Sequence, residues 1–201
     1  MSWIKIISYE KATGKLKKLY NRIKGPNNYI DNIMLVHSLR PNTLEGHMAM
    51  YKNVLHHSNN SFPKWFLEAI GVYTSALNKC DYCVNHHAEG MRKALNNDTK
   101  AAEIKTVLTQ NSPEKYFIGK ELAIMEYVQK LTQTPGEFTE EDLLHLKSTE
   151  INDGELLEVN QVVSYFCYAN RTVLGLGVNT RNDIIGLSPN DDSDSDNWSH
   201  T

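Results

Sequence analysis

The chain has little of what marks several common classes of protein. Its 201 residues include three cysteines, too few for the disulfide framework of a small secreted domain. No apolar run approaches the roughly 20 residues that cross a bilayer, and the apolar stretch in residues 1–7 is too short for a secretory signal. The net charge of −3 comes without a basic stripe. We therefore expect a cytoplasmic protein that binds neither membranes nor nucleic acid.

Period-two alternation bounded by turn residues is also missing, and helical spacing takes its place. Thr139 is followed three residues later by Asp142, the pattern of a capping box. Ser112 before Pro113 is a second helix-start signal. Apolar residues three and four apart predict helices near residues 9–24, 41–56, 63–78, 80–95, 99–109, 112–131, 139–148 and 154–174. The sequence predicts an all-α fold.

Composition suggests three parts along the chain. We expect residues 1–60 to form an N-terminal helical segment that packs on a helical core of residues 61–187. Residues 188–201 are rich in serine and aspartate and contain no lysine or arginine. Such a segment buries too little apolar surface to order itself, so the sequence predicts a disordered acidic tail.

Two cysteines and a histidine share one predicted helix, within residues 80–95. Taking about 100° per residue from Cys80, Cys83 lies about 60° and His87 about 20° to the same side. His86 lies about 120° away, so the two neighbouring histidines are not equivalent. The three residues Cys80, Cys83 and His87 therefore form one narrow face at the start of a helix.

Glu68 lies on the preceding predicted helix and can reach this face. If the two helices fold back on each other, Glu68 and His87 both stand about 12 to 16 Å from the turn near Lys79. A carboxylate can orient an imidazole, and the imidazole can accept a thiol proton. The positive end of a helix also favours the thiolate, the form that attacks a peroxide or a disulfide. These parts suit a Cys80–Cys83 redox pair that closes to a disulfide.

Two other interpretations of the same residues stay open. One is a zinc site, because zinc accepts the ligand types of Cys80, Cys83, His87 and Glu68. No second CxxC or CxxH pair accompanies these residues in the sequence. The cysteines could also be buried and inert. Cys167 lies among aromatic residues and is expected in the core.

The spacing of these residues resembles a family signature. The chain has Glu68, then eleven residues, then Cys80-Asp-Tyr-Cys83, then three residues and His87. This pattern resembles the motif of the alkylhydroperoxidase D (AhpD) and carboxymuconolactone decarboxylase superfamily. The run 160–171, followed by Gly175-Leu-Gly-Val178, looks like the C-terminal part of its peroxidase-related branch. The resemblance covers most of residues 30–180. Members of the family often carry a histidine inside the CxxC, where this chain has Tyr82.

The resemblance implies a compact helical protein that assembles as a trimer or hexamer. It implies a cysteine peroxidase in antioxidant defence, or a dithiol adaptor that passes electrons to a partner peroxidase. Cys83 would be the peroxidatic thiol, Cys80 the resolving thiol, and Glu68 with His87 the proton relay. The implied partners are a peroxide and a lipoamide-like or thioredoxin-like thiol donor, with no cofactor and no metal. Decarboxylase members lack the cysteine pair, so decarboxylation is the poorer alternative.

Overall fold

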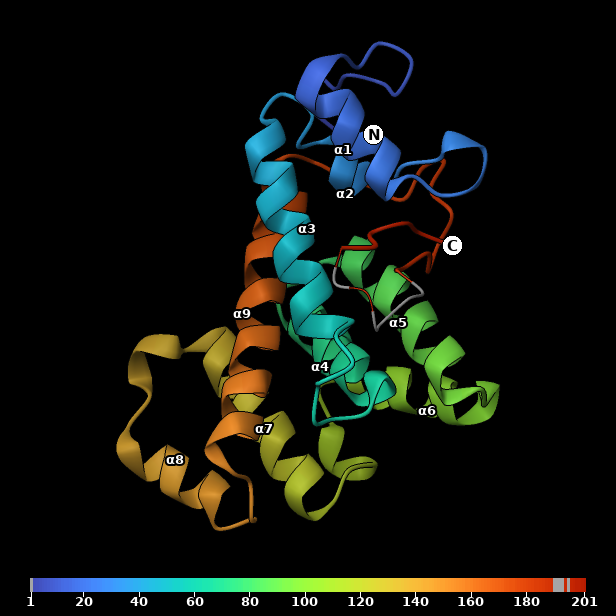
Figure 1. Ribbon diagram of the computed structural model, residues 1–201. Coiled ribbons are helices and arrows are strands. Elements are labelled where there is room, and N and C mark those ends of the chain that lie inside the picture. The colour runs from blue at the N-terminus through green and yellow to red at the C-terminus, as the bar shows by residue number, and fades with distance from the viewer. Residues whose placement is uncertain (1, 190–193, 195) are drawn as a thin grey trace. The chain divides into compact units, whose positions relative to one another are not determined.

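The computed structural model describes residues 2–189, 194 and 196–201 (Figure 1). Within these residues the regular structure is helical, and the one β-type pairing is an isolated bridge between Pro189 and His200. The predicted all-α fold is confirmed. None of the helices in the described part of the chain combines the length and apolar content that a membrane crossing requires.

The chain forms two compact units, and the second contains all four predicted site residues. One unit is Met1–Asn60 with Arg171–Thr201, and the other is Ser61–Asn170. The helices of the first are α1 (Gly14–Ile23), the 3₁₀ turn η1 (Pro26–Asn28), α2 (Asn32–Leu35) and α3 (Pro41–Leu55). Those that follow are α4 (Lys64–Leu77), α5 (Asp81–Leu95), α6 (Asp98–Thr109), η2 (Pro113–Lys115), α7 (Gly119–Gln133), η3 (Pro135–Glu137), α8 (Glu140–Lys147) and α9 (Asp153–Gly175), whose last turn continues into the first unit.

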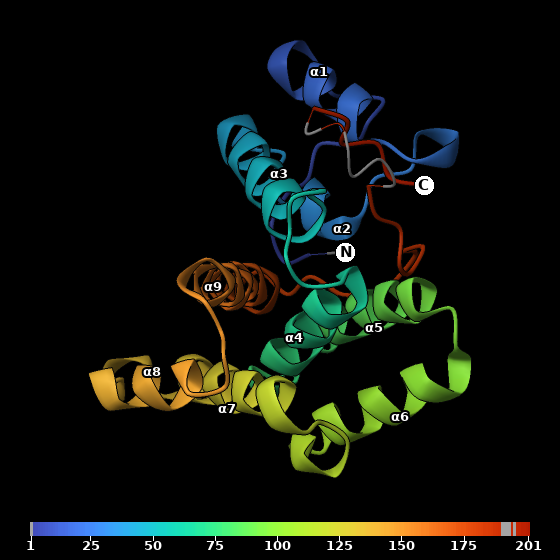
Figure 2. The same ribbon diagram turned by 60° about the horizontal axis from the view of Figure 1, so that its bottom comes forward.

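Helix α4 is the centre of the unit Ser61–Asn170. It packs against α5, α6 and α7 (Figures 1 and 2), and every residue from Phe66 to Ser75 is buried. Gly71 leaves space for the ring of Phe166 on α9, because a Cβ at that position would lie 2.1 Å from the ring. A helix that is apolar nearly all round must be covered on all sides, and the surrounding helices supply that cover.

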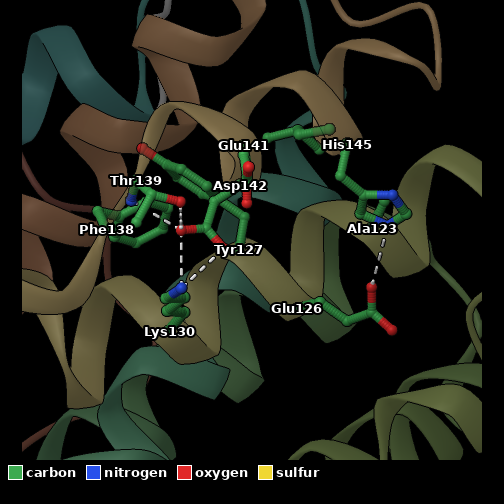
Figure 3. Close-up of a pocket in the computed structure, with 10 residues that line it drawn as sticks. Ala123, Glu126, Tyr127, Lys130, Phe138, Thr139, Glu141, Asp142 and His145 are labelled. Atoms are coloured by element: carbon green, nitrogen blue, oxygen red, sulfur yellow. Dashed lines mark hydrogen bonds and ion pairs between the residues drawn. The ribbon is translucent and has the colours of Figure 1, made fainter.

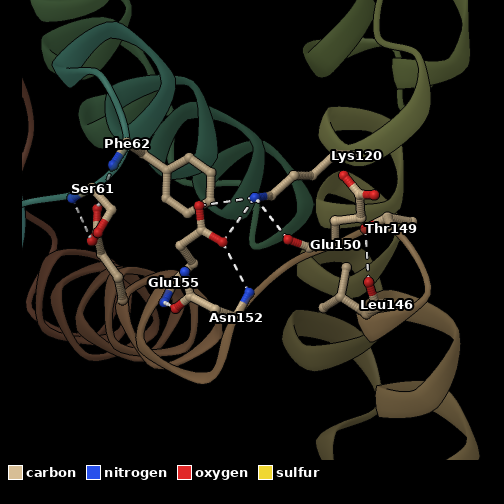
Figure 4. Close-up of polar contacts among 9 residues, drawn as sticks. Ser61, Phe62, Lys120, Leu146, Thr149, Glu150, Asn152 and Glu155 are labelled. Atoms are coloured by element: carbon tan, nitrogen blue, oxygen red, sulfur yellow. Dashed lines mark hydrogen bonds and ion pairs between the residues drawn. The ribbon is translucent and has the colours of Figure 1, made fainter.

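The start of α9 is fixed by polar contacts with its own first turn and with α7 (Figure 4). Asn152 and Glu155 exchange hydrogen bonds of 3.0 and 2.9 Å between side chain and backbone, which is the geometry of a capping box. Lys120 on α7 donates to both carboxylate oxygens of Glu155 at 2.8 Å. These contacts fix the first turn of α9, the helix that carries the Phe166 ring packed on Gly71 of α4.

Two predicted helices begin later than expected. The helix predicted at residues 9–24 is α1, which begins at Gly14. The predicted helix at residues 112–131 is wrong at its start, because η2 ends at Lys115 and α7 begins at Gly119. The hydroxyl of Ser112 donates to the Val107 carbonyl at 3.3 Å instead of capping a helix, and Phe117 is buried. Burying Phe117 therefore interrupts the helix that Ser112 and Pro113 suggest. The predicted capping box of α8 is confirmed, since the Thr139 N–H donates to Asp142 at 2.8 Å.

In the unit Met1–Asn60 with Arg171–Thr201, α1 packs against α3. The guanidinium of Arg22 stacks on the Trp198 ring at 3.5 Å, and both Trp198 and His200 are buried. Of the predicted disordered tail, residues 190–193 and 195 lie outside the described residues. The described end of that segment packs into the unit.

Candidate active site

The turn between α4 and α5 sets the position of the first cysteine. Lys79 has a left-handed φ of 58°, its N–H donates to the Ala76 carbonyl at 3.0 Å, and the Cys80 N–H donates to the Ser75 carbonyl at 2.8 Å. This pair of bonds is a Schellman motif. It ends α4 and immediately makes Cys80 the N-cap residue of α5. The sulfur of Cys80 therefore lies at the positive end of a helix.

Helices α4 and α5 bring the predicted acid and imidazole together. The Nδ1–H of His87 donates to Oε2 of Glu68 at 2.7 Å, and Glu68 is 2% exposed. A neutral imidazole with its proton on Nδ1 has Nε2 as its acceptor. The buried carboxylate thus selects the tautomer in which Nε2 can take up a proton.

Gly90 makes room for this carboxylate. A Cβ at Gly90 would lie 2.9 Å from Oε1 and 3.0 Å from Cδ of Glu68, closer than such atoms approach in folded proteins. Gly90 follows His87 by three residues, so both face α4 from the same side of α5. The acid fits against α5 because this position carries no side chain.

The two sulfurs lie 3.1 Å apart, at hydrogen-bond distance, and both cysteines are free thiols. Cys80 is fully buried and Cys83 is 2% exposed. Cys83 and His87 are one helical turn apart on α5, which places their Cβ atoms about 5–6 Å from each other. The structure therefore joins the predicted residues in two direct contacts, Glu68–His87 and Cys80–Cys83, within a single helix hairpin.

The two thiols do not ionise alike. A hydrogen bond from the Cys83 thiol lowers the pKa of Cys80, and burial of Cys80 opposes this shift. The backbone N–H of Cys83 lowers the Cys80 pKa further, although the Cys80 side chain makes no capping hydrogen bond to α5. The pKa of Cys83 is raised, first by its hydrogen bond to Cys80 and then by burial. The pair thus titrates as one unit whose first proton leaves Cys80.

Sequence patterns did not identify four further residues near the sulfurs. The Asn170 side chain lowers the pKa of both cysteines, and the Ser75 side chain lowers the pKa of Cys83. Asn78 in turn donates to Asn170 at 3.0 Å. Burial, followed by the charge of Cys83, raises the pKa of Tyr165 on α9. The available signal was a polar residue on an apolar helical stripe, as with Ser75 on α4 and Asn170 on α9.

The remaining candidates lie apart from these contacts. His86 stacks on Tyr82 with ring centroids 4.6 Å apart, so the two imidazoles of α5 have different neighbours. Cys167 is half-buried rather than in the core and accepts a weak 3.7 Å contact from Asn78. No cluster of three or more histidine, cysteine or acidic side chains in the described residues is placed to hold a metal ion.

A separate hollow of about 480 Å³ lies between α7 and α8 (Figure 3). Its wall includes the Lys130–Asp142 ion pair at 2.7 Å and the ring of Phe138. None of its lining residues contacts the cysteines in the interactions described above. The hollow is therefore a different feature from the thiol site.

Residues 41–129 match the sequence profile of the carboxymuconolactone decarboxylase family. The resemblance to the AhpD and carboxymuconolactone decarboxylase superfamily is thereby confirmed. The matched segment contains Glu68, both cysteines of the CxxC and His87. No curated protein matches the chain at a significant level.

Several solved structures share the AhpD-like fold. A peroxidase-related protein with an AhpD core from Ralstonia eutropha JMP134 has a TM-score of 0.74 and 18% identity, over 89% of this chain and 91% of that one. A peroxidase-related protein from Silicibacter sp. TM1040 has a TM-score of 0.67 and 23% identity, over 78% and 81%. The debrominase Bmp8 has a TM-score of 0.63 and 14% identity, over 85% and 87%. At these identities the similarity establishes the AhpD-like fold.

Proposed function

We propose that the protein is a thiol-dependent peroxidase that reduces hydroperoxides with Cys83 and Cys80. The observation that supports this most directly is the 2.7 Å contact of Glu68 with His87, one helical turn from Cys83. A buried acid–imidazole pair beside a dithiol supplies both a base and a nucleophile. The AhpD-like fold and the antioxidant and peroxidase names of its structural neighbours agree with this chemistry.

In the first step Cys83 attacks the peroxide. His87 accepts the Cys83 proton on Nε2 while Glu68 stabilises the imidazolium that forms. The thiolate attacks the terminal oxygen of ROOH, so that a sulfur–oxygen bond forms and the oxygen–oxygen bond breaks. The leaving alkoxide takes the proton from His87. Cys83 is oxidised to sulfenic acid and the peroxide is reduced to the alcohol ROH.

In the second step Cys80 resolves the sulfenic acid. Its sulfur is already within 3.1 Å of Cys83, and its lowered pKa favours the thiolate. The Cys80 thiolate attacks the Cys83 sulfur, a disulfide forms, and the departing hydroxide takes a proton and leaves as water. A lipoamide-like or thioredoxin-like dithiol then restores both thiols by exchange and is itself oxidised to a disulfide.

Stopped-flow mixing of the reduced protein with an organic hydroperoxide tests this proposal. We expect rapid consumption of peroxide with one Cys80–Cys83 disulfide formed per turnover, detected by mass spectrometry. Cys83→Ser should abolish the reaction, because serine cannot become a sulfenic acid. Cys167→Ser is the matched control and should react like the unmodified protein, since Cys167 is not part of the site.

Other results of these measurements would indicate a different function. If Cys83→Ser and the unmodified protein are equally inert toward peroxide, the peroxidase proposal is wrong. Fast exchange with a lipoamide-like donor would then indicate a dithiol adaptor. Stoichiometric zinc in gently purified protein, with thiols that react after a chelator is added, would indicate a metal-binding module.

A further inference from the structure

The imidazole of His87 contacts an aromatic ring as well as Glu68. The ring of Phe166 on α9 lies edge-to-face against it, with ring centroids 4.5 Å apart and ring planes at 84°. This is a favoured geometry for a pair of aromatic rings. Phe166 is fully buried, and the His87 side chain is 15% exposed. Side chains of α4 and of α9 therefore both contact the imidazole that α5 carries.

The Phe166 ring is itself held in place by α4. Gly71 lies at the tip of the ring, since a Cβ there would come within 2.1 Å of Cζ. Gly71 follows Glu68 by three residues, so the two positions lie on the same side of α4. One side of this helix thus supplies both the acid that binds Nδ1 of His87 and the space that admits the ring.

A single hydrogen bond leaves an imidazole some freedom to turn. The torsion about the Cβ–Cγ bond of histidine has broad minima, and a hydrogen bond bends to some extent before it weakens. The 2.7 Å contact with Glu68 restrains His87 at Nδ1. The Phe166 ring removes much of the remaining freedom, because a fully buried ring in a close-packed core cannot move aside easily.

We propose that Phe166 is a positioning residue that holds His87 in the orientation in which Glu68 binds Nδ1 and Nε2 is the acceptor. The purpose of this arrangement rests on the proposed function, in which Nε2 accepts the Cys83 proton. It does not depend on which oxidant reacts with the thiols. Phe166 acts through the imidazole, so the loss of its ring should appear in the tautomer of His87.

Nitrogen NMR of the imidazole tests this, because a protonated and an unprotonated ring nitrogen give different signals. Spectra are recorded at about pH 8, where an imidazole is ordinarily neutral, and the His87 signals are assigned by comparison with His87→Gln. In the unmodified protein we expect a protonated Nδ1, an unprotonated Nε2 and a nuclear Overhauser effect between the His87 and Phe166 rings. In Phe166→Leu the two nitrogen signals should move toward each other, because the imidazole then samples both tautomers.

Phe117→Leu is the matched control. Phe117 is also a buried phenylalanine of the unit Ser61–Asn170, and it packs against Phe66 of α4 with ring centroids 6.1 Å apart. The control loses the same atoms from the same core and should leave the nitrogen signals of His87 unchanged. Unchanged signals in Phe166→Leu, or an equal movement in both variants, would overturn the inference.

Phe166→Met is the second variant if Phe166→Leu does not fold. Methionine fills an irregular gap without supplying a ring, so this variant should mix the two tautomers as leucine does, and unmixed tautomers would overturn the inference. The unmodified protein gives an independent check that needs no substitution. Absence of the nuclear Overhauser effect between the two rings would overturn the inference by itself.

The rate of peroxide consumption is a separate measurement. Losing an aromatic pair should lower this rate about two- to tenfold in Phe166→Leu, whereas Phe117→Leu should react like the unmodified protein. The NMR measurement contains no peroxide. Mixed His87 tautomers in a protein that is inert toward peroxide would therefore keep this inference while the peroxidase proposal fails. A full peroxide rate with unmixed tautomers in Phe166→Leu would overturn this inference while the peroxidase proposal holds.

Discussion

Individual side chains determine which sulfur is ionised. The hydrogen bond from Cys83 is the largest influence on Cys80, and it lowers the Cys80 pKa. Cys83→Ala removes this donor, so the pKa of Cys80 should rise by about one unit. The alkylation midpoint of Cys80, measured by mass spectrometry over a pH series, should move upward by that amount.

Cys167→Ala serves as the control for this prediction, because Cys167 lies outside the pair. It should leave the Cys80 midpoint where it is. A Cys80 midpoint that stays constant or falls in Cys83→Ala would mean that the helix N-terminus alone sets the ionisation of Cys80.

Spacing along the chain was enough to select Glu68, Cys80, Cys83 and His87, since these residues lie on two consecutive helices. Ser75 and Asn170 were not recognised, and Asn170 is 95 positions from Ser75 in sequence. Their contact depends on how α9 packs on α4, which periodicity within one helix does not encode. A polar residue inside an apolar stripe is the sign that such a contact exists.

Among the helices, α4 and α5 approach closely where Glu68 faces Gly90. Gly90→Ala would place a Cβ 2.9 Å from the Glu68 carboxylate, so the carboxylate must move away from His87. We expect a lower rate of peroxide consumption, measured by stopped flow. The melting temperature should also fall, because overpacking costs about 1–3 kcal/mol and exceeds the gain from replacing a helical glycine.

Gly46→Ala is a matched control, since Gly46 also lies inside a helix and an added Cβ there meets nothing within 4 Å. This substitution should raise stability by about 0.4–1 kcal/mol and leave the peroxide rate unchanged. A Gly90→Ala protein that is as stable and as reactive as Gly46→Ala would show that the Glu68 position is not restricted by α5.

Helix type was predictable from apolar periodicity, whereas helix ends depended on tertiary contacts. The capping box at Thr139 is local and was predicted correctly. The start of α7 was not, because Ser112 and Pro113 favour a helix locally while Phe117 is buried and Gly119 has a left-handed φ of 53°. Burial of one aromatic side chain outweighed the local signal.

At the scale of the whole molecule, the buried side chain of His37 links stability to pH. Burial lowers the pKa of His37, and its Nδ1–H donates to Thr43 at 3.2 Å, because the Thr43 hydroxyl proton goes to the Arg40 carbonyl. The unfolded chain therefore binds a proton at a higher pH than the folded one. Stability is retained above the unfolded histidine pKa of about 6.5 and is lost as the pH falls toward the lower folded value.

Melting temperatures measured at about pH 7 and about pH 5, on either side of the unfolded histidine pKa, test this. His37→Gln should lose less stability on acidification than the unmodified protein, because glutamine does not titrate. His145→Gln is the control, since the His145 side chain is 71% exposed, and it should behave like the unmodified protein. An unchanged acid response in His37→Gln would exclude His37 as its source.

The grouping of Arg171–Thr201 with Met1–Asn60 was not visible in the sequence. Apolar periodicity is continuous through residues 154–174, so nothing local indicates that Arg171–Thr201 belongs with Met1–Asn60. That association joins segments separated by more than a hundred residues. It can be recognised only from contacts in the folded chain.

This arrangement has a consequence for biosynthesis. Ser61–Asn170 is continuous, so it can fold on the ribosome as soon as it emerges. The first sixty residues must wait for Arg171–Thr201, including the Trp198 that stacks under Arg22, before their own unit is complete. A chain that is released after Asn170 should therefore carry an assembled cysteine site beside an N-terminal segment that proteases still cleave.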